Sequence, residues 1–256
     1  MILTVDIGNT NIVIGGFCAD TLRFSTRIYT QRELEADQYA LTVNGILALH
    51  GVAGSDIEGI IISSVVPQVT PAVQHALRLL APAVTPVMFG ADKAPQMKIC
   101  IDNPPELGTD ILAGAVAVQS GYPLPAIIID MGTATKLTAL NAAGEVLGVS
   151  IMPGLFISLD ALTQRASALN GIALTAPQHA IGTNTKESMK SGVILGAASM
   201  LDGMIDRFEA ELGPVRTVVA TGGAAGLVIS SCRHTIEQNE TLILQGLYKT
   251  YINLQA

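Results

Sequence analysis

The chain has 256 residues, of which 49% are hydrophobic and 14% are charged, and its formal net charge is −7. This length is enough for a two-lobed globule with a sizeable core. The acidic balance, without any stretch rich in Lys and Arg, argues against a general nucleic-acid-binding protein, because such proteins displace counterions with clustered cations. The 25 glycines and the sparse charge favour an α/β fold with buried strands and tight turns.

Membrane, secretory and metal-binding signals do not stand out in the sequence. No apolar run approaches the roughly 20 residues of a membrane span, and the first residues follow a strand pattern rather than that of a secretory leader. Cys18, Cys100 and Cys232 are odd in number and lack CxxC spacing, so we expect neither a disulfide framework nor a zinc site. Cys232-Arg233-His234 is a cluster by proximity in the sequence only. We predict a cytoplasmic protein with no membrane or nucleic-acid partner.

The first half of the chain predicts an antiparallel meander followed by alternating helices and strands. The predicted strands are 2–5, 11–17, 22–27, 59–63 and 85–89. The predicted helices are 32–50, which Gly51 ends, 70–80, with Pro71 in its first turn, and 109–119, whose small residues suit close packing. An irregular, proline-bearing connection covers 90–105.

The second half repeats this plan. The predicted strands are 126–129, 135–140, 145–151 and 216–220, and the predicted helices are 185–212 and 240–254. Asn184 and Glu187 form a capping pattern at the start of the long helix, and Gly213-Pro214 closes it.

An Asp-x-Gly frame follows a predicted strand in each half, at Asp6-Ile7-Gly8 and at Asp130-Met131-Gly132. The glycine allows backbone to approach a ligand closely, backbone N–H groups and a threonine hydroxyl can bind phosphate oxygens, and the aspartate can hold a hydrated cation. A single frame also describes an ordinary strand-to-turn junction. Two frames about half a chain apart favour a phosphate site instead.

The duplicated order of three strands, a helix and alternating strands and helices resembles the ribonuclease-H-like fold of the actin, Hsp70 and sugar-kinase superfamily. The resemblance implies an α/β actin-like ATPase fold with an N-terminal lobe at 1–121, a C-terminal lobe at 122–256 and a nucleotide cleft between them. The turn Thr221-Gly222-Gly223 stands where that superfamily contacts the adenosine.

Within that superfamily, the order of motifs resembles type III pantothenate kinase, which phosphorylates pantothenate with ATP at the first step of coenzyme A synthesis. The matching motifs are DIGNTN at 6–11, SSVVP at 63–67, DNPPELGTD at 102–110, DMGTAT at 130–135, MPGL at 152–155, IGTNT at 181–185, SG at 191–192, ATGG at 220–223 and LILQGL at 242–247. Each is modest alone, but nearly the whole chain is covered in the right order.

The resemblance implies roles for individual residues. Asp110 would be the general base, and Asp130 would anchor a monovalent cation, K⁺ or NH₄⁺, with Asp6 as a second metal-contacting carboxylate beside the Mg²⁺ of ATP. The implied ATP-binding residues are Asp6, Ile7, Gly8, Asn9, Thr10, Asn11, Ile12, Val13, Gly132, Thr133, Gly222 and Gly223. The implied substrate-binding residues are Gly108, Thr109, Asp110, Ile111 and Thr185, of which Thr185 would reach the substrate from the neighbouring subunit of a homodimer.

Four positions depart from the family pattern. Ile111 and Gly114 stand where Arg and Asn are usual, Ile101 replaces a Tyr, and Lys136 follows the second hairpin where Thr is usual. Loss of an Arg removes a charge-assisted contact to the pantothenate carboxylate. Lys136 could replace that cation, or lie at the surface or near a phosphate. Two alternatives therefore remain: a kinase of this fold with another substrate, and a nucleotide-binding paralogue with little activity.

Overall fold

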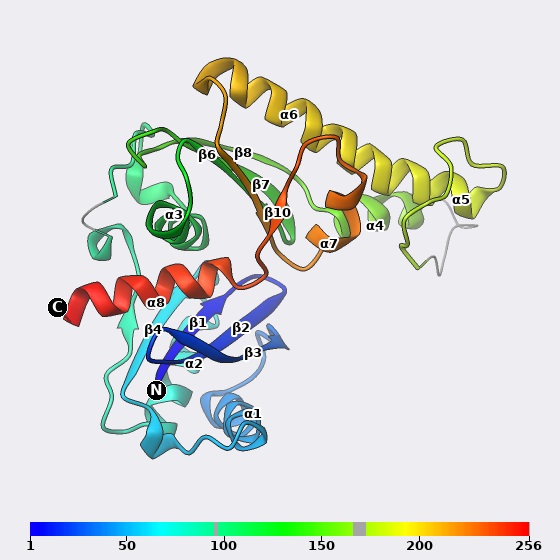
Figure 1. Ribbon diagram of the computed structural model, residues 1–256. Coiled ribbons are helices and arrows are strands. Elements are labelled where there is room, and N and C mark those ends of the chain that lie inside the picture. The colour runs from blue at the N-terminus through cyan, green and yellow to red at the C-terminus, as the bar shows by residue number, and fades with distance from the viewer. Residues whose placement is uncertain (95–96, 166–172, 256) are drawn as a thin grey trace. The chain divides into compact units, whose positions relative to one another are not determined.

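The computed structural model describes residues 1–94, 97–165 and 173–255, which form two compact units (Figure 1). The first unit comprises Met1–Met97, Asp102–Ser120 and Thr241–Ala256, and the second comprises Lys98–Ile101 and Gly121–Glu240. Each unit contains a five-stranded sheet. None of the helices in the described residues combines the length and the apolar character that a bilayer span requires.

The first sheet has the strand order β3-β2-β1-β4-β5. Its strands are β1 (Ile2–Ile7), β2 (Asn11–Cys18), β3 (Thr21–Tyr29), β4 (Gly59–Ser64) and β5 (Val87–Met88). The first three strands pair in antiparallel fashion, and β1 pairs with β4, and β4 with β5, in parallel. The predicted meander is therefore confirmed, although the last strand is shorter than the predicted 85–89.

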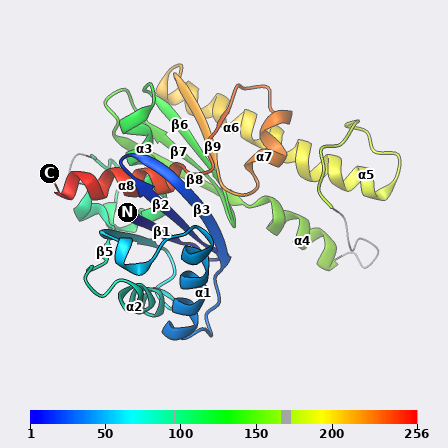
Figure 2. The same cartoon turned by 60° about the horizontal axis from the view of Figure 1, so that its bottom comes forward.

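Successive residues of a strand point to opposite faces of the sheet, and both faces of the first sheet are covered. On one face, Leu3, Val5 and Ile7 join an apolar core with α1 (Ala36–Leu49) and α2 (Thr70–Leu80), which lie beside each other (Figure 2). The other face is crossed by α8 (Leu242–Gln255), which packs on β1, β2 and β4. Pro71 lies in the first turn of α2, as predicted.

The C-terminal helix belongs to the first unit, whereas the sequence assigns all of 122–256 to the second lobe. Tyr248 of α8 stacks on Phe17 of β2, with ring centroids 4.4 Å apart. The backbone of α8 also approaches α3 (Thr109–Gly121) so closely that a Cβ at Gly246 would lie 1.8 Å from the Ala113 carbonyl oxygen. These contacts explain why a segment far along the chain completes the first unit.

The second sheet repeats the first, with the order β8-β7-β6-β9-β10 and the same sequence of antiparallel and parallel pairs. Its strands are β6 (Ala126–Met131), β7 (Ala134–Leu140), β8 (Val146–Pro153), β9 (Thr217–Thr221) and β10 (Glu237–Gln238). The duplication that the sequence predicts is confirmed at the level of strand order.

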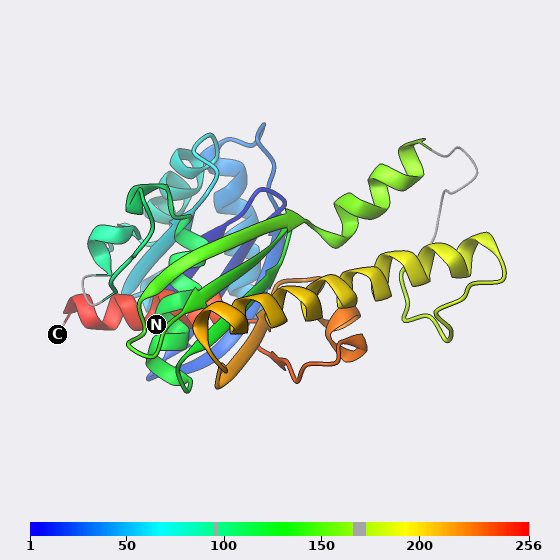
Figure 3. The same ribbon diagram turned by 90° about the horizontal axis from the view of Figure 1, so that it is seen from above.

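Helices of the second unit build its core against one face of this sheet. The predicted helix 185–212 runs as α5 (Thr185–Lys190), a π-helical segment (Ser191–Leu195) and α6 (Gly196–Leu212), and the Asn184 side chain caps it by accepting the Glu187 N–H at 3.1 Å. Two helices were not predicted from the sequence, α4 (Leu155–Arg165) and the short α7 (Ala225–Val228). Both α4 and α5 extend beyond the second sheet (Figure 3).

Candidate active site

The first Asp-x-Gly frame forms the tight hairpin that joins β1 to β2. The Gly8 N–H donates to the Asn11 carbonyl at 2.9 Å, and the Thr30 hydroxyl of the neighbouring chain segment donates to the Gly8 carbonyl at 2.6 Å. Asn9 and Thr10 are exposed at the tip, whereas the Ile7 and Ile12 side chains are fully buried in the core. Of the predicted loop, the isoleucines can therefore offer a ligand only their backbone groups.

Asp6 is close to the start of α3 because the end of β4 lies between them and contacts both. Asp6 lies opposite Ser63 in the parallel β1–β4 pair, and only 8% of Asp6 is exposed. Ser63 Oγ is hydrogen-bonded to Thr109 Oγ1 at 3.0 Å. The Thr109 hydroxyl also donates to the Ser64 carbonyl at 3.1 Å and accepts the Ser64 N–H at 3.2 Å. The predicted residues Asp6, Thr109 and Asp110 are thus brought together within the first unit.

Asp110 occupies the first turn of α3, where partial positive charge from unpaired N–H groups favours a carboxylate. Its Oδ1 atom accepts the Ile111 N–H at 2.8 Å. A Cβ at Gly108 would lie 2.6 Å from the same Oδ1 atom. Gly108 therefore leaves the room that the Asp110 carboxylate needs, and Ile111 lies partly buried beside it.

The second Asp-x-Gly frame joins β6 to β7, and backbone from two other segments packs tightly around it. The Gly132 N–H donates to the Ala134 carbonyl at 3.1 Å. A Cβ at Gly154 would lie 2.1 Å from the Thr133 carbonyl oxygen, and one at Gly222 would lie 2.6 Å from the Met131 carbonyl carbon. Gly222 also has a φ of +90°, which favours glycine. The hairpin and the Gly222-Gly223 turn, both predicted to bind ATP, are therefore neighbours within the second unit.

Lys136 projects toward Asp130. The two residues are directly opposite in the β6–β7 pair, and Lys136 Nζ lies 2.8 Å from Asp130 Oδ2. Only 15% of the Lys136 side chain is exposed, so Lys136 is not the fully exposed surface residue that was one of the possibilities left open by the sequence. A monovalent cation bound at Asp130 would meet this ammonium group, so the residues present do not fit the expected K⁺ or NH₄⁺ ion at that carboxylate.

The predicted substrate-binding residue Thr185 and the departing position Ile101 both lie on the second unit. Thr185 is the exposed first residue of α5, directly after the capping Asn184, and Ile101 belongs to the short segment Lys98–Ile101. Among the described residues, no group of three or more His, Cys, Asp or Glu side chains is arranged to hold a metal ion. In the part of the chain that the structure describes, neither Asp6 nor Asp130 therefore belongs to a group of three such side chains.

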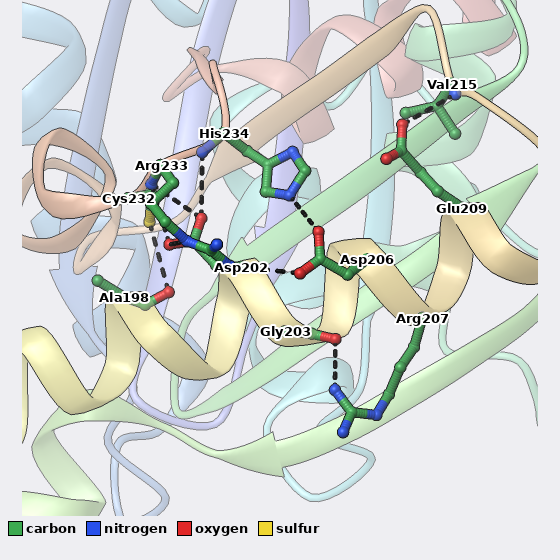
Figure 4. A network of polar contacts seen from close by, with 10 residues as sticks. All are labelled: Ala198, Asp202, Gly203, Asp206, Arg207, Glu209, Val215, Cys232, Arg233 and His234. Atoms are coloured by element: carbon green, nitrogen blue, oxygen red, sulfur yellow. Dashed lines mark hydrogen bonds and ion pairs between the residues drawn. The ribbon is translucent and has the colours of Figure 1, made fainter.

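The sequence cluster Cys232-Arg233-His234 has a structural role (Figure 4). Asp202 of α6 accepts the Arg233 N–H at 2.9 Å on each oxygen and the His234 N–H at 3.1 Å. Asp206 accepts from His234 Nε2 at 2.7 Å. Burial, and secondly Asp202, raise the pKa of the Cys232 thiol to about 11, so this thiol stays protonated near neutral pH and is a poor nucleophile.

Ser63 and Ser64 contact Thr109 in this candidate site, although neither is among the residues that the sequence predicts for it. Their motif SSVVP matches the family pattern, but the sequence predicts no role for either residue. The signal that could have found them is the position of Ser63 at the end of β4, since ligand sites of α/β sheets gather at the carboxyl ends of strands.

Comparison with known proteins agrees with this geometry. The family model for type III pantothenate kinase matches residues 2–207. A type III pantothenate kinase of Halalkalibacterium halodurans is 38% identical over 251 residues, covering 98% of each chain. One of Thermomicrobium roseum is 37% identical over 252 residues, covering 98% of this chain and 96% of the relative.

Solved structures show the same fold at low sequence identity. The activator of the 2-hydroxyisocaproyl-CoA dehydratase from Clostridium difficile, with bound ADPNP, is similar with a TM-score of 0.61 and 13% identity, over 99% of this chain and 97% of that chain. The ROK hexokinase from Thermus thermophilus has a TM-score of 0.53 and 14% identity, over 99% of each chain. The predicted actin-like ATPase fold is confirmed by these similarities and by the duplicated sheets.

The family model matches most of the chain, and the curated relatives are similar over nearly all of it. These two findings decide between the alternatives that the sequence left open. The chain belongs to the type III pantothenate kinase family, the ATP-dependent kinases that phosphorylate pantothenate in coenzyme A biosynthesis.

Proposed function

We propose that this chain phosphorylates the hydroxyl group of pantothenate with Asp110 as the general base. The observation that carries the proposal is the hydrogen bond between Ser63 and Thr109, which fixes the first turn of α3, and with it Asp110, next to the strand end that bears Asp6. A positioned carboxylate that stays ionised near neutral pH can accept a hydroxyl proton when it lies within hydrogen-bond reach.

In the proposed reaction, the pantothenate hydroxyl oxygen attacks the γ-phosphorus of ATP. A new P–O bond forms to pantothenate, the bond from the γ-phosphorus to the β-γ bridging oxygen breaks, ADP leaves, and the hydroxyl proton moves to Asp110. Because phosphoryl transfer needs little covalent help from the protein, most of the rate comes from alignment and charge neutralisation.

The phosphates of ATP are proposed to contact the two hairpins. Residues 6–13 would offer backbone N–H groups and the exposed hydroxyl of Thr10, and the second unit would offer Gly132, Thr133 and the turn at Gly222-Gly223. Asp6 would help to hold the Mg²⁺ ion that accompanies ATP, since Mg²⁺ keeps several waters and takes only one or two carboxylates.

Substrate binding is proposed to involve the segment Gly108–Ile111 together with Thr185. By the family resemblance, Thr185 would belong to the neighbouring subunit of a homodimer. Exposed apolar side chains on the second unit, which also contains Thr185, support an interface between two copies of the chain. Phe156 and Leu162 of α4 are 50% and 48% exposed, and Ile181, just before α5, is 85% exposed. A charge at Leu162 is therefore expected to weaken the dimer, which sedimentation equilibrium would detect.

A cytoplasmic location is proposed as well. All three cysteines of the chain are free thiols, and free thiols are typical of a reducing compartment.

The proposed chemistry is tested by ADP release from purified protein with ATP and Mg²⁺, with and without pantothenate. We expect pantothenate-dependent turnover in the wild type and a loss of roughly 10²- to 10⁴-fold in Asp110→Asn, with ATP affinity unchanged. Asp92→Asn is the matched control, because Asp92 is an exposed carboxylate of the same unit. Turnover in Asp110→Asn at the wild-type rate would show that another group accepts the proton.

A further inference from the structure

Asp130 and Lys136 form an ion pair that the strand register of the second sheet builds in. Asp130 of β6 is directly opposite Lys136 of antiparallel β7, and directly opposite residues of such a pair project from the same face. Lys136 Nζ lies 2.8 Å from Asp130 Oδ2. The contact therefore follows from the fold and is not a chance meeting of two flexible surface side chains.

The surroundings make this pair different from an ordinary surface salt bridge. Only 15% of the Lys136 side chain and 18% of the Asp130 side chain are exposed, whereas Lys98, in an ion pair with Glu145 on the same unit, is 70% exposed. Partly buried charges are screened less by salt than exposed ones. A lysine ammonium is also a compact point charge with three donors and no acceptor. It thus offers the Asp130 carboxylate the same kind of charge as a bound monovalent cation.

The backbone that carries Asp130 has little room to move. The Met131 and Thr133 backbone is in contact with Gly222 and Gly154, where even a methyl group would collide. Asp130 also lies opposite Thr221 in the parallel β6–β9 pair, so it is flanked by strands on both sides. The ammonium group is consequently held at the base of the second phosphate hairpin.

A further cation at the Asp130 oxygens would lie next to the Lys136 ammonium, and like charges disfavour each other where water is scarce. We propose that Lys136 is the resident cation of the second phosphate hairpin: its ammonium neutralises Asp130 and supplies the positive charge that K⁺ or NH₄⁺ would otherwise supply. Binding of ATP and its turnover are then independent of added monovalent cation. This inference rests on the proposed binding of ATP phosphates by that hairpin.

The first test measures nucleotide affinity, which does not depend on the identity of the phosphate acceptor. The Kd of Mg²⁺-ATP is determined by calorimetry in KCl and in tetramethylammonium chloride, each at an ionic strength of about 0.1 M so that screening is equal. We expect the wild-type Kd to differ less than about twofold between the two salts, and Lys136→Thr to bind roughly tenfold more weakly without K⁺ and to recover in KCl.

Two further variants sharpen the result. Lys136→Arg keeps a cation at this position and is expected to stay insensitive to K⁺. Lys98→Thr removes an exposed lysine of the same unit and is expected to match the wild type in both salts. Circular dichroism and the thermal midpoint of each variant identify any that fails to fold, and the wild-type comparison between salts decides the question without them.

A wild-type Kd that tightens tenfold or more in KCl would overturn the inference, and so would a folded Lys136→Thr whose affinity equals that of the wild type in both salts. ADP release with and without pantothenate is measured in the same two salts. Salt-independent ATP binding without pantothenate-dependent turnover would contradict the proposed reaction while leaving the role of Lys136 intact.

Discussion

Ser63 and Thr109 are joined by a 3.0 Å hydrogen bond between their side-chain oxygens, although they are 46 residues apart in the sequence. Ser63 is the strand partner of Asp6, and Thr109 immediately precedes Asp110. One contact therefore connects the carboxylate of the hairpin proposed to bind phosphate to the carboxylate proposed as general base. Both residues are in the first unit, so this part of the site is built without the second.

The first prediction concerns Thr109→Val, which keeps the side-chain shape and removes the hydroxyl. The three hydrogen bonds of that hydroxyl to Ser63 and Ser64 are lost. We expect kcat to fall roughly ten- to a hundredfold, because small displacements of a catalytic group cost rate, and the free energy of unfolding to fall by about 1–3 kcal/mol. Steady-state kinetics and urea unfolding measure the two effects.

The matched control for this prediction is Thr42→Val. The Thr42 hydroxyl donates to the Gln38 carbonyl on the exposed face of α1, so its loss is expected to leave kcat unchanged. A Thr109→Val enzyme with the kcat of the wild type would show that the Ser63–Thr109 contact does not position Asp110.

The second prediction is that Ile111→Arg improves the use of pantothenate. Ile111 lies beside Asp110 in the first turn of α3 and is partly buried, and the family resemblance implies an Arg here that binds the substrate carboxylate. A charge-assisted hydrogen bond contributes about 1.5–3 kcal/mol, so we expect the KM for pantothenate to fall roughly ten- to a hundredfold while kcat changes little. The measurement is the KM of each enzyme in the ADP-release assay.

Pantothenol, in which the carboxylate is replaced by an uncharged alcohol, is the control substrate for Ile111→Arg. Its KM is expected to stay the same in both enzymes. An equal gain for both substrates would mean that the arginine acts on something other than the carboxylate.

The succession of strands along the chain could be predicted from the sequence because the signals for strands and turns are local. Short β-rich runs, turn residues and two Asp-x-Gly frames predict the meander in each half, and the capping pattern of Asn184 is confirmed at the start of α5. The helix α4 was missed, since its sequence, which begins Leu155-Phe156-Ile157, exposes several apolar side chains and so lacks a clear amphipathic stripe.

The contacts of the site depend on pairings between distant residues, which local patterns do not determine. The position of Lys136 opposite Asp130 could have been derived from the hairpin register alone, because the two residues are symmetric about its turn. By contrast, the contact of Ser63 with Thr109 requires that β4 pairs in parallel with β1 and that α3 begins beside the end of β4. The membership of α8 in the first unit depends on the close packing of Gly246 against Ala113. Local sequence patterns do not encode those contacts.

The third prediction concerns the packing of Gly246 in α8 against Ala113 in α3. In Gly246→Ala, the new methyl group would lie 1.8 Å from the Ala113 carbonyl oxygen, which is backbone and cannot rotate away. We expect α8 to be displaced from α3 and the free energy of unfolding to fall by about 3 kcal/mol or more. The thermal midpoint should fall by roughly 5–10 °C, as differential scanning calorimetry would measure.

Gly45→Ala is the matched control and is expected to raise the free energy of unfolding. Gly45 lies in the exposed middle of α1 with no atom within 4 Å of an added Cβ, so alanine should stabilise the protein by about 0.5–1 kcal/mol through helix propensity. If both alanine variants had the same midpoint, the close approach of α8 to α3 would not exist in solution.

The fourth prediction is a pH dependence carried by Asp202. Burial acts to raise the pKa of this carboxylate, but the backbone N–H groups of Arg233 and His234 outweigh it, so the pKa lies below its usual value of 3.8. A carboxylate with a lowered folded-state pKa contributes stability above its unfolded pKa, and this contribution is lost as the pH falls through the folded value. The stabilisation is therefore fully present at neutral pH and declines below about pH 4.

Asp202→Asn tests this contribution directly. The Asp202 side chain is only 4% exposed, whereas the Arg233 side chain is 74% exposed. The backbone N–H donors therefore stabilise the ionised Asp202 carboxylate more than the guanidinium charge does. An amide has only one acceptor oxygen for these donors, and we expect a loss of about 1–3 kcal/mol at pH 7. Urea unfolding from pH 7 to pH 3 should show the wild type and the variant converging below pH 4, whereas Asp206→Asn, at a 54% exposed carboxylate, should change the free energy of unfolding little. A difference between wild type and Asp202→Asn that stays constant down to pH 3 would mean that ionisation of Asp202 does not hold the 232–234 segment on α6.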